Sequence, residues 1–413
     1  MIGRTLFIVV QGYPFDGESF LELELKFLSP SFEKILILNT DSPGNEGPQN
    51  YSLPSNARFV LSDKRCRIKM KFFFASLKFL VREFFRLLRT GLISLSGLRI
   101  LLGSLIKSLR FSSFTEGLLK QEKGDCFLYT YWVSEYSLSL LLLKEQNKDL
   151  NIFSKAHAWD IYEFRHRPAY LPFRYSIFSD PELAVFFISQ HAKQYCIEHY
   201  KVKDAGHFHV LYMGTRNDSD LANLPSSEVF TMVSCSSLIP LKRVHLIIDA
   251  LALTDKKIRW IHFGDGPLSD ALKQKAIKEL SPKENISVSW KGLQPNAEIM
   301  EFYRKTPVDL FINVSEYEGL PVSVMEALSF GIPVLATDTG GVEEIVKEGN
   351  NGMLLEVNSN GSAIKKAIED VYDLKDEKKI MYRENAYQRW KEYFNAEKNY
   401  ALFLQAILNG TRR

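Results

Sequence analysis

Short apolar runs alternate with helix-like segments between residues 230 and 357, and this alternation limits the fold more than any other feature of the sequence. Runs of this length that are mostly apolar throughout are typical of strands covered on both faces. Helices between successive strands favour crossover connections, which make neighbouring strands parallel. The pattern therefore predicts a doubly wound α/β domain. Its expected strands are 230–235, 258–263, 286–290, 308–314, 332–337 and 353–357, and its expected helices are 244–253, 268–280, 297–303 and 322–330.

The first half of the chain has the same character in a less regular form. At 413 residues the chain is too long for one ordinary core, so we expect two domains. The polar stretch 216–227 is typical of a linker between them. The expected elements of the first half are strands at 6–10, 35–39, 126–131, 151–153 and 185–188, with a glycine-containing loop after the first of them and a helix at 19–28.

Composition and charge narrow the classes of function. The formal net charge of +3 is too small by itself to indicate a nucleic-acid-binding protein. The four cysteines are widely separated, in no spacing that predicts a zinc site or a redox pair, and we expect a reduced, cytoplasmic setting. The first residues lack the order of charged, apolar and small residues that marks a secretion signal.

Two glutamates eight positions apart, Glu318 and Glu326, flank a Gly-Leu-Pro turn from which a helix is expected to start. The free N–H groups of the turn and the positive end of the helix dipole suit an anion such as a diphosphate. Carboxylates beside that anion can accept hydrogen bonds from hydroxyl groups. We therefore expect Glu318 to hold a sugar and Glu326 a ribose, at the edge where doubly wound sheets bind ligands.

This spacing of glutamates, with Gly319, Leu320 and Pro321 between them and Gly340-Gly341 behind, resembles the motif of the retaining glycosyltransferases of family 4. The resemblance covers nearly the whole chain and is most specific in residues 230–346. It implies the GT-B fold, in which two Rossmann-like, doubly wound domains face an interdomain cleft.

The resemblance also implies an activity and a separate role for each domain. It predicts a hexosyltransferase that moves a sugar from a nucleotide diphosphate to a hydroxyl acceptor with retention of configuration, in assembly of a bacterial surface polysaccharide or glycolipid. The donor is a co-substrate, and no separate cofactor is expected. The implied domains are 1–215 for the acceptor and 216–390 for the nucleotide sugar, with a helix in 391–413 that returns to the first domain.

The loop after residue 235 resembles the family loop in which an Arg and a Lys neutralise the donor diphosphate. Lys242 matches the family Lys, whereas Ser237 stands where the family has Arg. A fixed cation stabilises the leaving diphosphate more than the ground state, because negative charge grows there as the glycosidic bond breaks. Either Lys242 and backbone amides suffice, or another cation such as Arg243 takes the place of the missing Arg.

In the first domain, His157 resembles the histidine that ends a strand in this family and reaches the donor sugar. It could hydrogen-bond a sugar hydroxyl or, when protonated, lie near developing negative charge; the alternative is a histidine satisfied by its own neighbours. Asp160 and Glu18 are acceptor-side candidates, although Glu18 could equally begin the following helix. Gly12 and Gly17 let the preceding loop approach a ligand closely.

The expected site therefore draws on both domains. Its catalytic residues are His157, Lys242 and Glu318, and its donor contacts are Gly12, Gly17, Ser237, Lys242, Arg243, Gly264, Glu318, Gly319, Leu320, Pro321 and Glu326.

Two other motifs are set aside. Gly264-Asp265-Gly266 lacks the third glycine of the dinucleotide fingerprint, which disfavours a nicotinamide oxidoreductase. Asp218-Ser219-Asp220 spells the metal-binding Asp-x-Asp of another glycosyltransferase class, but it lies in the expected linker, so no metal is expected.

Residues 64–111 are rich in Lys, Arg, Phe and Leu and contain one acid, Glu83. Charges interrupt the segment too often for it to span a bilayer. It is either a core helix with a basic outer face or a helix that binds the anionic inner face of the cell membrane, within reach of a lipid-linked acceptor. On a helix, Lys71, Lys78, Arg82, Arg86 and Arg89 form one stripe, and Phe73, Leu77, Leu80, Phe84 and Leu87 lie opposite.

Two alternatives to this function stay open. The same donor chemistry could serve a small soluble acceptor in place of a saccharide or lipid-linked saccharide. A protein that binds sugar nucleotides without catalysis is compatible with Ser237 in place of the family Arg.

Overall fold

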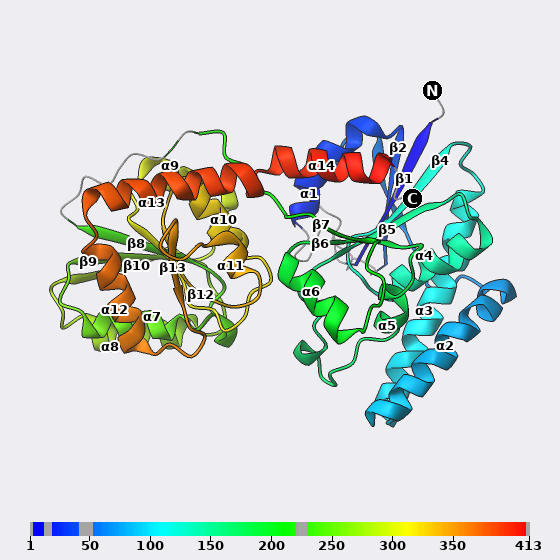
Figure 1. The fold of residues 1–413 in the computed structure, drawn as a ribbon, viewed down its shortest axis with the longest axis horizontal. Helices are drawn as coiled ribbons and strands as arrows, with labels where there is room; N and C mark the ends of the chain where they lie inside the picture. Colours follow the sequence, from blue (N-terminus) through cyan, green and yellow to red (C-terminus); the bar gives the residue numbers. More distant parts are fainter. Residues whose placement is uncertain (1–2, 12–18, 41–52, 220, 222–228, 410–413) are drawn as a thin grey trace. The chain divides into compact units, whose positions relative to one another are not determined.

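The computed structural model describes residues 3–11, 19–40, 53–219, 221 and 229–409. The chain forms two compact units, Met1–Leu211 with Tyr400–Arg413 and Tyr212–Asn399 (Figure 1). The end of the chain thus belongs to the first unit. The unit boundaries, 211/212 and 399/400, lie four and nine residues from those expected at 215/216 and 390/391.

The first unit is built on a seven-stranded sheet in which every neighbouring pair of strands is parallel. The strand order β3-β2-β1-β4-β5-β6-β7 is that of a doubly wound sheet. Its strands are β1 (Arg4–Val10), β2 (Lys34–Asn39), β3 (Ala57–Leu61), β4 (Asp125–Thr130), β5 (Asn151–Ala156), β6 (Ala184–Phe187) and β7 (Phe208–Val210). Its helices are α1 (Ser19–Leu28), α2 (Met70–Thr90), α3 (Leu95–Leu119), α4 (Glu135–Gln146), α5 (Arg174–Phe178) and α6 (Gln190–His199), with short turns η1 (Ser29–Ser31) and η2 (Glu163–Arg165).

The second unit repeats the plan with a six-stranded, all-parallel sheet in the order β10-β9-β8-β11-β12-β13. Its strands are β8 (Phe230–Cys235), β9 (Ile258–Phe263), β10 (Ile286–Trp290), β11 (Leu310–Asn313), β12 (Val334–Thr337) and β13 (Gly352–Leu355). Its helices are α7 (His245–Leu253), α8 (Ser269–Leu280), α9 (Asn296–Lys305), α10 (Val322–Ser329), α11 (Val342–Ile345), α12 (Gly361–Tyr372) and α13 (Asp376–Arg389), with turns η3 (Pro240–Lys242) and η4 (Trp390–Phe394). The last helix, α14 (Ala396–Leu408), begins in this unit and ends in the first.

The predicted fold class is confirmed, because both sheets are parallel and doubly wound. Strands β8, β9 and β10 have the bounds that their apolar runs predict. β12 begins at Val334, two residues later than predicted, and Pro333 contributes only its carbonyl, which accepts from Phe311 N–H at 2.9 Å. The edge strands β3 and β7 were not predicted, since β3 has no fully buried residue and β7 has only three residues.

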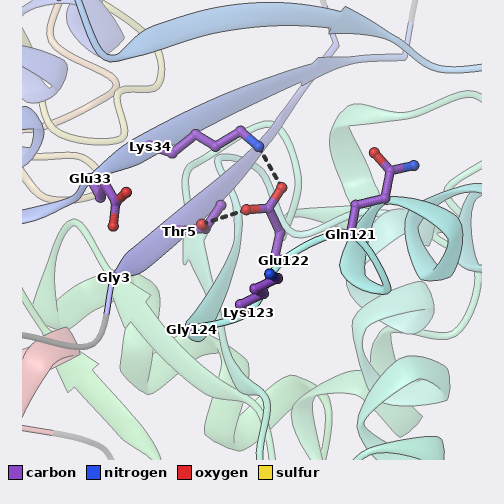
Figure 2. Close-up of a pocket in the computed structure, with 8 residues that line it drawn as sticks. All are labelled: Gly3, Thr5, Glu33, Lys34, Gln121, Glu122, Lys123 and Gly124. Carbon is purple, nitrogen blue, oxygen red and sulfur yellow. Dashed lines mark hydrogen bonds and ion pairs between the residues drawn. The ribbon is translucent and has the colours of Figure 1, made fainter.

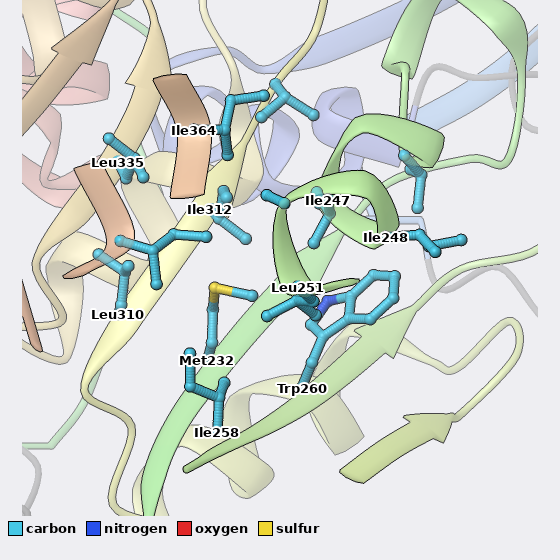
Figure 3. Close-up of a cluster of buried hydrophobic side chains, with 14 of the residues drawn as sticks. Met232, Ile247, Ile248, Leu251, Ile258, Trp260, Leu310, Ile312, Leu335 and Ile364 are labelled. Atoms are coloured by element: carbon cyan, nitrogen blue, oxygen red, sulfur yellow. The ribbon is translucent and has the colours of Figure 1, made fainter. Parts of the chain in front are cut away.

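One face of the second sheet packs against α7 and α12 (Figure 3). Met232, Trp260 and Ile312 come from three neighbouring strands, and Leu251 and Ile364 come from the two helices. All five are essentially inaccessible to water. This burial explains why the strands are apolar throughout, since each face of the sheet has a helical cover.

The last helix is anchored in the first unit by a buried ion pair. Lys155 of β5 donates to the carboxylate of Glu24 on α1, and both side chains are buried. The Lys155 ammonium lies 4.5 Å from the ring centroid of Phe403 and 5.7 Å from that of Tyr400, both on α14. A paired charge under aromatic rings therefore holds the end of the chain against this sheet.

A polar pocket lies at the amino ends of β1, β2 and β4 (Figure 2). There the Glu122 carboxylate accepts from Lys34 Nζ at 2.5 Å and from Thr5 Oγ1 at 3.0 Å. Ligands of doubly wound sheets bind at the opposite, carboxyl ends of the strands, so this pocket is not the candidate site.

A buried polar network lies inside the second sheet. Trp260 Nε1 donates to Ser234 Oγ at 2.9 Å, and Ser234 Oγ lies 2.8 Å from His262 Nδ1. Because the indole can only donate, Ser234 Oγ accepts that bond, and its contact with Nδ1 completes the network. Burial lowers the pKa of His262 to about 4, so the ring is neutral.

We expect Ser234→Ala to lower the free energy of unfolding by about 1–3 kcal/mol, because it leaves a buried indole N–H and Nδ1 without partners. Urea unfolding measures the change. The matched control is Ser287→Ala, on the exposed surface of β10 in the same sheet, which should stay within about 0.5 kcal/mol of the wild type. Equal midpoints for the two variants would show that the network contributes nothing to stability.

Candidate functional site

The loops that follow β8, β9, β11 and β12 meet at the carboxyl edge of the second sheet. Ser236 N–H donates to Phe263 O at 3.0 Å and joins the loops after β8 and β9. Glu316 N–H donates to Leu241 O at 2.9 Å, and Gly341 N–H donates to Gly319 O at 2.8 Å. Backbone hydrogen bonds thus link all four loops into one surface, where the fold class predicts a ligand.

Glu318 lies at the centre of this surface and is 8% exposed. Its Oε1 accepts from Lys242 Nζ at 2.6 Å, from Ser315 Oγ at 2.6 Å and from Asn313 Nδ2 at 3.1 Å. A carboxylate can be buried at this depth only when it is paired and hydrogen-bonded. The three donors therefore fix the position of the Glu318 side chain.

Two glycines permit the close packing of these loops. Gly340 has φ of +58°, and a Cβ there would lie 1.8 Å from the carbonyl oxygen of Glu318. Gly264 has φ of +130°, and a Cβ there would lie 1.9 Å from the carbonyl oxygen of Ser236. A side chain at either position would displace a loop that carries a candidate residue.

The cations of the loop after β8 have different roles. Lys242 ends the turn η3 and pairs with Glu318. Arg243, in the left-handed conformation at φ +48°, donates from its three guanidinium nitrogens to carbonyl oxygens of Val314 (2.8 Å), Val357 (2.6 Å) and Ser315 (3.2 Å). Those bonds make Arg243 a brace between loops, which favours the alternative in which Lys242 and backbone amides act without a second cation.

Ser237 lies on the exposed part of the same loop. Its position at the rim of the surface is compatible with contact to a ligand, but its hydroxyl carries no charge. Gly264 lies on the neighbouring loop. Its backbone N–H donates to Gly292 O at 2.8 Å and is therefore already engaged within the protein.

Helix α10 begins directly behind Glu318. Pro321 precedes its first residue, and no side chain caps the helix. The first N–H groups of such a helix have no partners within the helix and face the loop that holds Gly319 and Leu320. An uncapped N-terminus beside Lys242 and Glu318 suits an anion, as the sequence predicts.

Glu326 lies on α10 and is 9% exposed. Its Oε1 accepts from Asn296 Nδ2, at the start of α9, at 2.6 Å. Burial raises the pKa of Glu326 to about 7, and the bond from Asn296 opposes that rise. The carboxyl group is therefore poised between its neutral and charged forms near neutral pH, and hydroxyl donors would favour the charged form.

In the first unit, His157 follows β5 and is 7% exposed. Its ring centroid lies 4.4 Å from that of Trp132 and 5.1 Å from that of Tyr131. Burial, and next the charge of Lys155, lower the pKa of His157 to about 3. The protonated form considered from the sequence is thus strongly disfavoured, and a neutral donor or acceptor role is left.

The Nε2 atom of His157 is buried and has no hydrogen-bond partner in the part of the chain that the structure describes. Buried polar groups without partners are uncommon and call for an explanation. This atom is consistent with the ligand role and does not fit a histidine satisfied by its neighbours.

Asp160 acts on the backbone around His157. Its two carboxylate oxygens accept from His157 N–H and Val133 N–H, each at 2.7 Å, and the side chain is 4% exposed. Burial raises the pKa of Asp160 to about 7, whereas the nearby charge of Arg174 lowers it. The structure therefore gives this acceptor-side candidate a positioning role, because both oxygens are already engaged.

The remaining candidates have other outcomes. Gly12, Gly17 and Glu18 lie outside the described residues. In the Asp-x-Asp motif, Asp218 pairs with Arg216 at 2.9 Å. Within the described ranges, no group of three or more metal-ligating side chains is gathered.

Three site residues were not predicted from the sequence: Asn296, Asn313 and Ser315. Ser315 lies within the Glu318 motif, and Asn313 ends β11 two residues earlier, so strand-end polarity was the available signal. Asn296 lies in a different loop, after β10, and no pattern in the sequence links it to Glu326.

Comparison with known proteins identifies a family that matches part of the chain. Residues 217–389 match the sequence model of the family described as Glycosyl transferases group 1. A curated relative, the N-acetyl-alpha-D-glucosaminyl L-malate synthase of Bacillus anthracis, is 30% identical over 173 residues, which are 40% of this chain and 42% of the relative. The chain spans less than half the length of the curated relatives that it matches.

Solved structures match over nearly the whole chain. The lipopolysaccharide outer core galactosyltransferase WaaB, in its apo form, has a TM-score of 0.69 at 17% identity and covers 98% of this chain and 99% of its own. The Anabaena protein HepE in complex with UDP has a TM-score of 0.65 at 17% identity, with 98% and 100% covered. The chain therefore has the GT-B fold, and its residues 217–389 match the glycosyl transferases of group 1.

Proposed function

We propose that this protein is a retaining glycosyltransferase that moves a sugar from a nucleotide diphosphate to a hydroxyl acceptor. The observation that carries the proposal is the contact of Lys242 with Glu318 at the uncapped N-terminus of α10, with Glu326 on the same helix. One surface thus offers a cation and a helix end for a diphosphate and two carboxylates for hydroxyls. The match of residues 217–389 to a glycosyltransferase family supports this function.

The roles of the residues follow from charge. Lys242 and the N–H groups before α10 would stabilise the diphosphate as it leaves, because its negative charge grows while the sugar bond breaks. Glu318 would accept hydrogen bonds from sugar hydroxyls through its second oxygen, since Oε1 already accepts three. Glu326 would accept from the ribose, which favours its charged form.

Retention of configuration is proposed to arise because the acceptor hydroxyl attacks the sugar on the same face from which the diphosphate leaves. Glu318 is a poor candidate for a covalent nucleophile, because its ion pair and hydrogen bonds stabilise the carboxylate and lower its tendency to attack. The leaving phosphate would then help to remove the proton of the acceptor hydroxyl, and His157 in its neutral form would hydrogen-bond the sugar.

The acceptor is proposed to be a saccharide or lipid-linked saccharide in surface polysaccharide or glycolipid assembly, at the cytoplasmic face of the membrane. The fold of the lipopolysaccharide galactosyltransferase supports this setting by analogy alone. The name of the relative N-acetyl-alpha-D-glucosaminyl L-malate synthase contains malate, a small soluble molecule. This relative supports the alternative of the same donor chemistry on a soluble acceptor.

The first test is thermal stabilisation of the purified protein by UDP, GDP, ADP and NAD, each without added metal. A nucleotide diphosphate at a hundred times its dissociation constant should add about 2.7 kcal/mol of stability. The gain should be lost in Glu326→Ala and kept in Glu298→Ala, an exposed carboxylate on α9. No response to any of the three diphosphates would contradict the proposed donor site, and a response to NAD alone would replace it with a nicotinamide site.

Lys242 provides a test of turnover. We expect Lys242→Ala to lower kcat by about 10²–10³-fold, because its charge acts mainly on the leaving group, whereas Lys242→Arg should keep part of the activity. Steady-state release of the nucleotide diphosphate measures this effect, with the thermal midpoint as a check on folding. Nucleotide binding with no turnover in the wild type would favour the alternative of a non-catalytic binding protein.

The pKa of Glu326 predicts a pH-dependent stability. Because its pKa is raised from 4.5 to about 7, the folded protein holds a proton that the unfolded chain has released, and stability falls as pH rises from about 4.5 to 7. Glu326→Gln stays neutral and can still accept from Asn296. We expect this variant to exceed the wild type at pH 8 by up to about 3 kcal/mol in urea unfolding, with the gap closing near pH 4.5. A gap of the same size at both pH values would rule out this ionisation as its cause.

A further inference from the structure

Helix α2 turns its most apolar surface toward solvent. The residues that it buries form one row, Phe72, Ser76, Phe79, Glu83 and Leu87, in which a serine and a glutamate take part. The outward face of α2 carries large apolar side chains instead, with Phe74 63% exposed and Phe85 55% exposed. That face consists of Phe74, Leu77, Val81, Phe84, Phe85 and Leu88, all exposed.

This arrangement fits the core-helix alternative only in part, because Leu87 is buried whereas other apolar side chains of the expected inner face are exposed. Phe73, Leu77 and Phe84, expected to pack inward if the helix served the core, are exposed. Arg86, expected on the basic stripe, is largely buried, donates to Glu83 at 2.8 Å and lies over the rings of Tyr170 and Tyr175. The charged pair of Glu83 and Arg86 thus lies inside the protein, and the large apolar side chains of the outward face lie at the surface.

Helix α3 extends the exposed surface. The two helices pack against each other as an antiparallel pair (Figure 1), and the turn between them begins at Gly91, with φ of +68°. Leu102 and Ile106 of α3 are 50% and 43% exposed. The outward face of α2, with Leu102 and Ile106, is here called the α2/α3 face. Soluble proteins rarely expose so many neighbouring large apolar side chains without a partner.

A basic stripe runs along one side of the α2/α3 face. Lys71, Lys78, Arg82 and Arg89 are exposed and recur at helical spacing directly beside the apolar row. Lys71 and Lys78 pair with Glu116 and Glu145. Within the described residues, no ion pair involves Arg82 or Arg89, so their charges are available to an outside partner.

We propose that the α2/α3 face docks on an anionic bilayer, with α2 lying in the plane of the membrane surface. An apolar row flanked by unpaired arginines is complementary to acyl chains below and anionic headgroups beside them. Within the residues described, no helix has the length and apolarity needed to cross a bilayer, so the helix lies along the surface. A second copy is a poorer partner, because the single acid of α2, Glu83, is buried and the helix has no exposed carboxylate to pair with the arginines of another copy.

Docking would bear on the acceptor, a consequence that rests on the proposed function. A pocket at the carboxyl ends of β2 and β3 is lined by Thr40, Ser62, Asp63, Lys64, Phe111, Tyr136, Lys107 and Arg110. The last two belong to α3 and follow Ile106 within about one turn. A bilayer on the α2/α3 face would therefore lie near a pocket with hydroxyl and cationic groups, which suits a lipid-borne acceptor with an anionic headgroup.

The test is sedimentation of the full chain with vesicles of phosphatidylglycerol and phosphatidylcholine at low salt, compared with phosphatidylcholine alone. The wild type should bind the anionic vesicles. Phe74→Ser with Phe85→Ser should weaken binding at least about tenfold. Arg82→Gln with Arg89→Gln should weaken it about 25-fold, at about fivefold for each charge.

The matched control for the apolar pair is Leu253→Ser with Ile277→Ser, two side chains of the second unit that are 55% and 66% exposed. It should bind like the wild type. All variants should keep the stabilisation by a nucleotide diphosphate, so that loss of docking is distinguished from failure of the donor site.

Two results would overturn the proposal. The first is a wild type that stays in the supernatant with anionic vesicles at low salt. The second is a dimer in analytical ultracentrifugation that the Phe74→Ser, Phe85→Ser variant dissociates, which would make the α2/α3 face a contact between copies of this chain.

Discussion

The buried carboxylate of Glu318 is the interaction on which the candidate site depends. A charge at 8% exposure requires donors, and its three donors come from two loops, Lys242 after β8 and Asn313 and Ser315 at the end of β11. The loop after β12 can pack against Glu318 only because Gly340 has no side chain to meet the Glu318 carbonyl. Arg243 adds a second brace through three backbone carbonyls. The site is therefore rigid before any ligand arrives, which is the condition for electrostatic stabilisation of a reaction.

The balance of charge explains how such a site can receive an anion. Lys242 is offset by Glu318, and Glu326 is near its pKa of about 7, so the surface carries little net charge of its own. A diphosphate would meet the positive end of α10 and the Lys242 ammonium at once. Ser237 has no charge where the resemblance to family 4 implies an arginine, so under the proposed function the helix end would contribute more to binding the diphosphate.

The first six strands of each unit have the same order in the sheet, β3-β2-β1-β4-β5-β6 in the first and β10-β9-β8-β11-β12-β13 in the second. The units differ in the segments that connect equivalent strands. Between β10 and β11 there is one helix, α9, whereas the equivalent connection between β3 and β4 holds the long pair α2 and α3. The shorter connection supplies Asn296 to the candidate site. The longer one contains the α2/α3 face. The equivalent connections therefore provide an exposed surface in the first unit and a site residue in the second.

The sequence by itself determined the class of fold and the neighbourhood of the site. Continuous apolar runs such as β8 and β9 must be strands buried on both faces, and Glu318 and Glu326 had to lie near a helix start because Pro321 and the spacing require it. Edge strands β3 and β7 escaped prediction because half-exposed strands have no such run. The tertiary structure alone decided that Arg243 binds carbonyls, that His157 is neutral, that Asn296 meets Glu326, and which face of α2 points outward. Each of these depends on contacts between segments far apart in the chain or on depth of burial, and helical periodicity identifies two faces of α2 without saying which one the protein covers.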